Sequence, residues 1–141
     1  MPAKNHPAPA LVKTPESEKI TINMGFVDLG HVDLLVAEGF YSNRTDFIRT
    51  AIRTHLASHA DVLRQAVSRK MLVLGLQTFS AADLEAVRAA GETLQIRVLG
   101  LAVIAPDVSA ALATATIDSL TVLGVLHASP DVKTALAGRI R

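Results

Sequence analysis

The chain has 141 residues, 50% of them hydrophobic, which is enough for one domain or two small ones with a buried core. Its 14 basic and 13 acidic side chains give a net charge of +1, so the composition as a whole indicates neither a nucleic-acid binder nor an acidic tail, and any basic site must be local. The absence of cysteine excludes disulfides, thiolate metal sites and thiol catalysis.

The first 17 residues contain four of the six prolines and show neither a helical nor a strand period. This composition predicts a disordered arm over residues 1–17. The arm lacks the apolar core of a signal peptide, and no apolar run elsewhere reaches the roughly 20 residues that a membrane span requires. We therefore expect a cytoplasmic protein with no membrane partner.

The composition changes near residue 70. Residues 1–70 carry nine basic and seven acidic side chains, whereas residues 71–141 carry five and six, and Phe79 is the only aromatic residue of the second half. This shift predicts two domains, over residues 18–68 and 71–141.

Residues 19–24 alternate between polar and apolar side chains, which predicts a short strand with one buried face. The buried face would hold three apolar residues: Ile20, Ile22 and Met24. The other face would present three polar residues: Lys19, Thr21 and Asn23. No hairpin turn and no second alternating run lie nearby, so both edges of the strand would lack a partner. A second copy of the chain is the simplest partner.

After Gly25 the apolar residues recur three to four positions apart as far as Val36. This spacing predicts an amphipathic helix of about three turns. Gly39 is expected to end it, because glycine readily adopts the left-handed conformation that closes a helix.

A second helix is expected to begin at Asn43. Its side chain can cap the free amides, and Asp46, three residues later, makes a variant of the capping box. The apolar face runs from Phe47 to Leu56, and the exposed face is basic, with Arg44, Arg49 and Arg53.

These elements resemble the ribbon-helix-helix family of bacterial DNA-binding proteins, of the MetJ, Arc and CopG type. The likeness covers residues 18–57 and rests on the alternating segment at 19–24 and on the run Gly-Phe-Tyr-Ser-Asn-Arg-Thr-Asp-Phe-Ile-Arg at 39–49. It implies an α+β fold in which two chains form a dimeric antiparallel β-ribbon, each adding two helices. The ribbon would enter the major groove of double-stranded DNA. No known family is recognised in residues 71–141.

The polar face of such a ribbon supplies candidate base readers. Lys19 can donate to guanine, Asn23 can pair with adenine, and the methyl group of Thr21 can contact thymine. A solvated strand face is the alternative. The start of the second helix favours an anion, and the resemblance implies that it contacts backbone phosphate through Ser42, Asn43, Arg44 and Thr45. A structural cap alone is the alternative there.

His55 and His59 lie four residues apart and could present two imidazoles to a metal. Asp61 is the only further ligand that can be named nearby, so a surface histidine pair is the better interpretation. We assign no metal and no cofactor.

Residues 98–113 and 122–137 repeat each other at an offset of 24, and a weaker third copy starts at Val73. Each copy has an apolar run with a central glycine, followed by a helix-start signal. The pattern predicts about three 24-residue strand-helix units with parallel strands. Asp107 and Asp131 occupy equivalent places in two copies, where we expect them to cap helices. With no catalytic motif at any recognisable spacing, we expect no enzyme.

The leading hypothesis is therefore a homodimeric, sequence-specific transcriptional repressor, whose residues 71–141 mediate higher assembly or sensing. One alternative is an antitoxin that represses its own operon, although the toxin-binding segments of such proteins are typically charged and extended. Another is a polymer anchored on DNA for plasmid segregation or nucleoid organisation.

Overall fold

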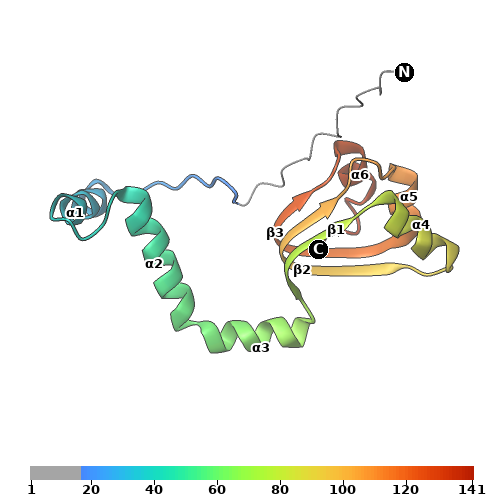
Figure 1. The fold of residues 1–141 in the computed structure, drawn as a ribbon, viewed down its shortest axis with the longest axis horizontal. Coiled ribbons are helices and arrows are strands. Elements are labelled where there is room, and N and C mark those ends of the chain that lie inside the picture. Colours follow the sequence, from blue (N-terminus) through green and yellow to red (C-terminus); the bar gives the residue numbers. More distant parts are fainter. Residues whose placement is uncertain (1–16) are drawn as a thin grey trace, which may run out of the picture.

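The computed structural model describes residues 17–141, so the predicted arm lies outside the described residues except for Ser17. Three helices precede three strands, and each strand is followed by a further helix (Figure 1). The elements in chain order are α1 Phe26–Ala37, α2 Arg44–Ser58, α3 Ala60–Lys70, β1 Val73–Phe79, α4 Ala81–Ala89, β2 Leu94–Ile104, α5 Ala110–Thr116, β3 Ile117–His127 and α6 Pro130–Ala135. This mixture of helices and strands confirms the predicted α+β class.

The two predicted helices of the N-terminal part are present as α1 and α2. The chain leaves α1 through Gly39, which has a φ of 84° in the left-handed region, as predicted for a closing glycine. α1 contributes the buried Val32. After Gly39, the ring of Tyr41 meets the ring of Phe47 in α2 edge-to-face, with the ring centroids 5.0 Å apart. The Tyr41–Phe47 contact holds the loop between the two helices against α2.

Residues 19–24 are extended but belong to no sheet within the single chain. The side chains of Ile20 and Ile22 are 70% and 57% exposed. The expected ribbon is therefore not formed by one copy, because a strand forms only when its backbone groups find a partner.

α3 is an element that the sequence did not predict. The helix is interrupted at His59, whose φ and ψ of −106° and 14° are not helical. An eleven-residue helix, α3, follows directly. α3 ends at Met71, which adopts the left-handed conformation with φ 51°. Figure 1 shows α2 and α3 as an arm between α1 and the sheet.

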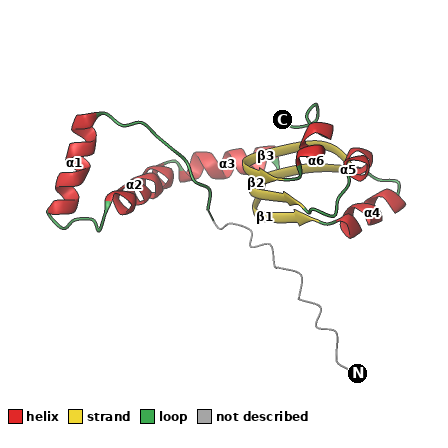
Figure 2. Cartoon of the chain, turned by 90° about the horizontal axis from the view of Figure 1, so that it is seen from above, coloured by secondary structure: helices red, strands yellow, loops and turns green. Residues whose placement is uncertain are grey.

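The three strands form one parallel sheet in the order β1-β2-β3 (Figure 2). The register places Gly75 opposite Gly100, and Gly100 opposite Gly124. All three glycines have positive φ, at 106°, 137° and 122°. A Cβ on Gly100 would overlap the carbonyl oxygen of Gly75, and a Cβ on Gly124 would overlap that of Gly100. Only glycine therefore fits this row.

β2 and β3 curve sharply, so that each strand has two arms that run back over one another (Figure 1). The main core lies on the inner side of this bend and beneath the helices α4, α5 and α6. Its members are aliphatic residues of β2, β3, the three helices and the adjoining loops: Leu84, Ile96, Val98, Ala102, Ile104, Val108, Leu112, Ala113, Ile117, Leu120, Val132 and Leu136. Thr116, the one buried polar side chain among residues 17–141, donates to the carbonyl of Leu112 at 2.7 Å, so its burial leaves no hydroxyl unpaired.

The last residues run beside β3. The amide of Leu120 donates to the carbonyl of Arg139 at 3.0 Å, and the amide of Arg141 donates to the carbonyl of Leu120 at 2.8 Å. The guanidinium of Arg139 also donates to the carbonyls of Thr114 and Ile117, at 2.6 Å and 2.7 Å. This segment therefore protects part of the β3 edge and holds α5 to the start of β3.

Candidate nucleic-acid interface

The three predicted base readers lie on the extended segment before α1. Lys19, Thr21 and Asn23 are all exposed. Gly25, the residue before α1, provides no side-chain cap, and its carbonyl accepts from the amide of Leu29 at 3.0 Å at the start of the helix. The three polar side chains are thus open to solvent in the single chain.

The predicted phosphate-binding residues lie together at the start of α2. The Asn43 side chain accepts a hydrogen bond from the amide of Asp46 at 2.8 Å, as the sequence predicts. The Asp46 carboxylate accepts in return from the amide of Ser42 at 3.0 Å, one residue before the position that a standard capping box would use. This exchange fixes the loop from Ser42 to Thr45 against the first turn of the helix.

Two backbone donors remain at this helix start. Among residues 17–141, the amides of Arg44 and Thr45 have no hydrogen-bond acceptor. Free amides at the positive end of a helix dipole are suitable donors for an anion. The helix start thus combines a fixed backbone with two available N–H groups.

The side chain of Arg44 has a partner that the sequence did not predict. Its guanidinium donates two hydrogen bonds to the carboxylate of Asp33 in α1, at 2.7 Å and 2.8 Å. The hydrogen bond from Arg44 lowers the pKa of Asp33, and the same contact raises the pKa of Arg44. In this conformation the Arg44 charge is paired with Asp33, so a phosphate would have to compete with that carboxylate.

The other basic residues of α2 and α3 differ in whether they are already paired with a carboxylate. Arg49 and Arg53 are exposed and form no ion pair with any residue between 17 and 141. Arg64 of α3 pairs with Asp61 at 3.1 Å. The exposed face of α2 is therefore basic, as the sequence predicts.

The histidine pair at the end of α2 is a surface contact between rings. The rings of His55 and His59 meet edge-to-face, with their centroids 4.9 Å apart. Within residues 17–141, no group of three or more His, Asp or Glu side chains is placed to hold a metal ion.

The prediction that Asp107 caps its own helix is wrong. α5 begins only after Ser109, whose hydroxyl accepts from the amide of Leu112 at 3.1 Å. Asp107 instead accepts from the amide of Ala81 at 3.1 Å, in the first turn of α4. Asp131, its counterpart in the sequence repeat, does lie in the first turn of α6. The two aspartates are thus not structurally equivalent, and Asp107 links two neighbouring strand-helix pairs.

Comparison with known proteins identifies the class of the chain. The profile of the ribbon-helix-helix transcriptional regulator family matches residues 15–133, and the chain belongs to this family. The match extends well past residues 18–57, on which the sequence resemblance rests, and includes all three strands of the sheet. No curated protein matches the chain, and no solved structure does.

Family membership places the chain among DNA-binding transcriptional regulators. Of the helices between residues 17 and 141, none is both long enough and apolar enough to cross a bilayer.

Proposed function

We propose that the protein is a homodimeric, sequence-specific transcriptional repressor. The observation that carries the homodimer is the poor burial of residues 17–70, in which Val32 is the only fully buried side chain. Ten large apolar side chains of this part are exposed, among them Phe26 at 95% and Phe40 at 71%. A segment with so little burial cannot offset the conformational entropy that folding costs. A second copy provides the missing core.

The extended residues 19–24 are the proposed contact between the two copies. Pairing two such segments antiparallel would satisfy their backbone groups and cover Ile20 and Ile22. The side chains of Lys19, Thr21 and Asn23 would then project together from the opposite face, where each can read a base edge in the major groove.

The start of α2 is the proposed phosphate clamp. The amides of Arg44 and Thr45 are available as donors, and Ser42 and Asn43 are held rigidly beside them by Asp46. A phosphate bound there would set the register of the ribbon on the duplex without selecting a sequence. Arg44 would join the clamp by exchanging Asp33 for the phosphate.

Residues 71–141 are proposed to form a separate domain that links dimers into a higher oligomer. On β1, Leu74 and Leu76 are exposed, and the register aligns Leu74 with Leu99 and then with Leu123. Such a row of aliphatic residues beside the free edge of β1 suits contact with another copy. A folded sheet also differs from the extended, charged segment typical of an antitoxin, which favours the repressor.

Selection of bound fragments from the source genome tests the repressor, with the particle mass measured by light scattering. We expect a dimer or a multiple of it, and enrichment of inverted repeats at promoters. Enrichment at a toxin operon together with co-purification of a small toxin would instead identify an antitoxin. Filaments that lengthen with concentration would identify the polymer. A stable monomer that binds every fragment equally would contradict all three.

A further inference from the structure

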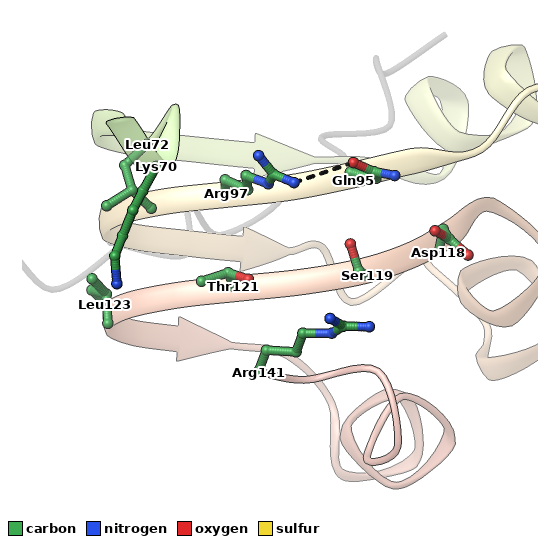
Figure 3. A pocket seen from close by; sticks show the side chains of 9 residues that line it. All are labelled: Lys70, Leu72, Gln95, Arg97, Asp118, Ser119, Thr121, Leu123 and Arg141. Atoms are coloured by element: carbon green, nitrogen blue, oxygen red, sulfur yellow. Dashed lines mark hydrogen bonds between the residues drawn. The ribbon is translucent and has the colours of Figure 1, made fainter. Parts of the chain in front are cut away.

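An open groove of about 560 Å³ lies on the outer surface of the sheet, over the arms of β2 and β3 that precede the glycine row (Figure 3). Its volume is in the range of about 300–1,000 Å³ that small-molecule sites occupy. Three cationic side chains reach it from three different parts of the chain: Lys70, Arg97 and Arg141. Figure 3 shows them on three sides of the Thr121 side chain.

The positive charge of this groove is not balanced within the described chain. The only ion pairs among residues 17–141 are Arg44–Asp33 and Arg64–Asp61, so Lys70, Arg97 and Arg141 have no carboxylate within 4.0 Å. Asp118 is the one acidic residue that lines the groove, and Figure 3 shows it at the end away from Lys70. Three cationic side chains against one acidic side chain in a concave surface attract an anion.

The floor of the groove carries neutral hydrogen-bonding groups in a fixed array. The register pairs Gln95 with Ser119 and Arg97 with Thr121 on adjacent parallel strands. The Cα atoms of the four residues therefore form a rectangle with sides of about 5–7 Å. Arg97 makes one weak contact, donating to the Gln95 side chain at 3.4 Å. Its other N–H groups and the hydroxyls of Ser119 and Thr121 have no hydrogen-bond partner among residues 17–141. An oxygen-rich anion can accept from several of them at once.

We propose that this groove binds a small molecule through a phosphate or carboxylate group held by Lys70, Arg97 and Arg141. Thr121 and Ser119 donate to the same group, and Asp118 accepts from a hydroxyl or amine at the far end of the ligand. The apolar side chains of Leu72 and Leu123 close the end beside Lys70.

Lys70 connects this site to DNA binding, so that the ligand regulates the protein. This step rests on the proposed function. Lys70 is the last residue of α3, and α3 directly follows the DNA-contacting helix α2. An anion that binds Lys70 and Arg97 together joins the end of α3 to β2. The ligand thus fixes the orientation of the helical arm relative to the sheet and changes the spacing that the dimer can match on DNA.

Calorimetric titration of the full chain with inorganic phosphate, and separately with succinate, tests the site without any DNA. We expect saturable binding of at least one probe, and the better probe identifies the anionic group. Arg97→Gln should weaken that binding roughly tenfold or more, because it removes a charge-assisted contact. Arg88→Gln is the matched control, since Arg88 is exposed on α4 and does not line the groove. No saturable binding, or equal losses in both variants, would overturn the proposal.

Thr121→Val is a second variant that keeps the charge and the shape. It should lower the affinity for the same probe several-fold. Thermal unfolding should stay unchanged, because the Thr121 hydroxyl makes no hydrogen bond to any of the residues 17–141. Unchanged probe affinity with Thr121→Val would remove the floor hydroxyl from the site.

Duplex DNA of random sequence separates this site from the DNA interface. We expect Arg97→Gln to bind random duplex as the unaltered chain does, with the same salt dependence. A weaker, flatter salt dependence would show that the groove contacts the DNA backbone and would overturn the small-molecule proposal. If the chain fails to bind any operator but still binds phosphate or succinate through Arg97, the proposed repressor is wrong while the anion site stands.

Discussion

Arg44 at the first position of α2 and Asp33 of α1 are joined by two hydrogen bonds, at 2.7 Å and 2.8 Å. The two residues are 11 positions apart, so this contact is tertiary and orients one helix against the other. It also places a carboxylate on the side chain that the family resemblance assigns to phosphate. If Arg44 contacts a phosphate as we propose, that role competes with its pairing to Asp33.

Asp33→Asn should strengthen binding to random duplex, because it releases the Arg44 guanidinium. If that side chain then contacts a phosphate, the slope of log affinity against log salt should steepen by about 0.9 per added contact. Asp28→Asn is the control, since it removes the same charge from α1 and Asp28 forms no ion pair within residues 17–141. Arg44→Ala should have the opposite effect and flatten the slope. Equal changes for Asp33→Asn and Asp28→Asn would show that Arg44 stays away from DNA.

The same ion pair predicts an acid dependence of the α1–α2 contact. Arg44 lowers the pKa of Asp33 in the folded chain below its unfolded value, so folding favours the ionised carboxylate. The contribution is fully present above the unfolded pKa and is lost as pH falls through the lowered folded pKa. Urea unfolding followed by circular dichroism across this acidic range should show it, and Asp33→Asn should reduce the dependence. An identical pH profile in Asp33→Asn would exclude a contribution from this pair.

Asn23→Ala tests the base-reading face. Loss of a bidentate contact to adenine should weaken operator binding by about 1–3 kcal/mol and spare binding to random duplex. Affinity for both duplexes should be measured at one salt concentration, because the phosphate contribution varies with salt. Equal losses on the two duplexes would show that Asn23 does not read a base.

Local signals sufficed for the parts of the N-terminal region that depend on local contacts. The period after Gly25 predicts α1, and the Asn43 cap with its partner Asp46 is present as the spacing indicates. The pairing of Arg44 with Asp33 could not be read in this way, because it depends on the angle between two helices. α3 was missed because a non-helical residue, His59, separates it from α2 without a proline or glycine to mark the break.

The sheet shows a second limit of sequence reasoning. Gly100 and Gly124, which are 24 residues apart in the sequence repeat, lie side by side in the register. The apparently equivalent Asp107 and Asp131 do not correspond, because α5 begins later after its strand than α6 does. The groove residues Gln95 and Arg97 precede the first well-matched repeat position, so nothing in the repeat singled them out. Only the register shows that they adjoin Ser119 and Thr121.

Gly100→Ala should destabilise the sheet strongly. Gly100 has a φ of 137°, and a Cβ there would overlap the Gly75 carbonyl oxygen. The backbone conformation alone costs a non-glycine residue about 1–3 kcal/mol, and the overlap adds to it. Gly138→Ala is the control, since a Cβ there meets nothing within 4 Å. Denaturant unfolding at one protein concentration measures both. Equal stability of the two variants would contradict the close approach of Gly100 to the Gly75 carbonyl.

Ile22→Asp distinguishes a dimer contact from ordinary surface exposure. In the single chain, Ile22 is 57% exposed and Leu74 is 66% exposed. From burial within one copy alone, aspartate should therefore lower stability only mildly, and to a similar extent, at either position. If Ile22 is covered by a second ribbon strand, Ile22→Asp should bury a charge at the dimer contact and yield monomers that no longer bind operator. Leu74→Asp should leave the dimer and its DNA binding intact and reduce only higher assembly. Sedimentation equilibrium and operator titration of both variants give the answer. A dimeric Ile22→Asp variant with undiminished operator affinity would place the contact between copies elsewhere in the chain.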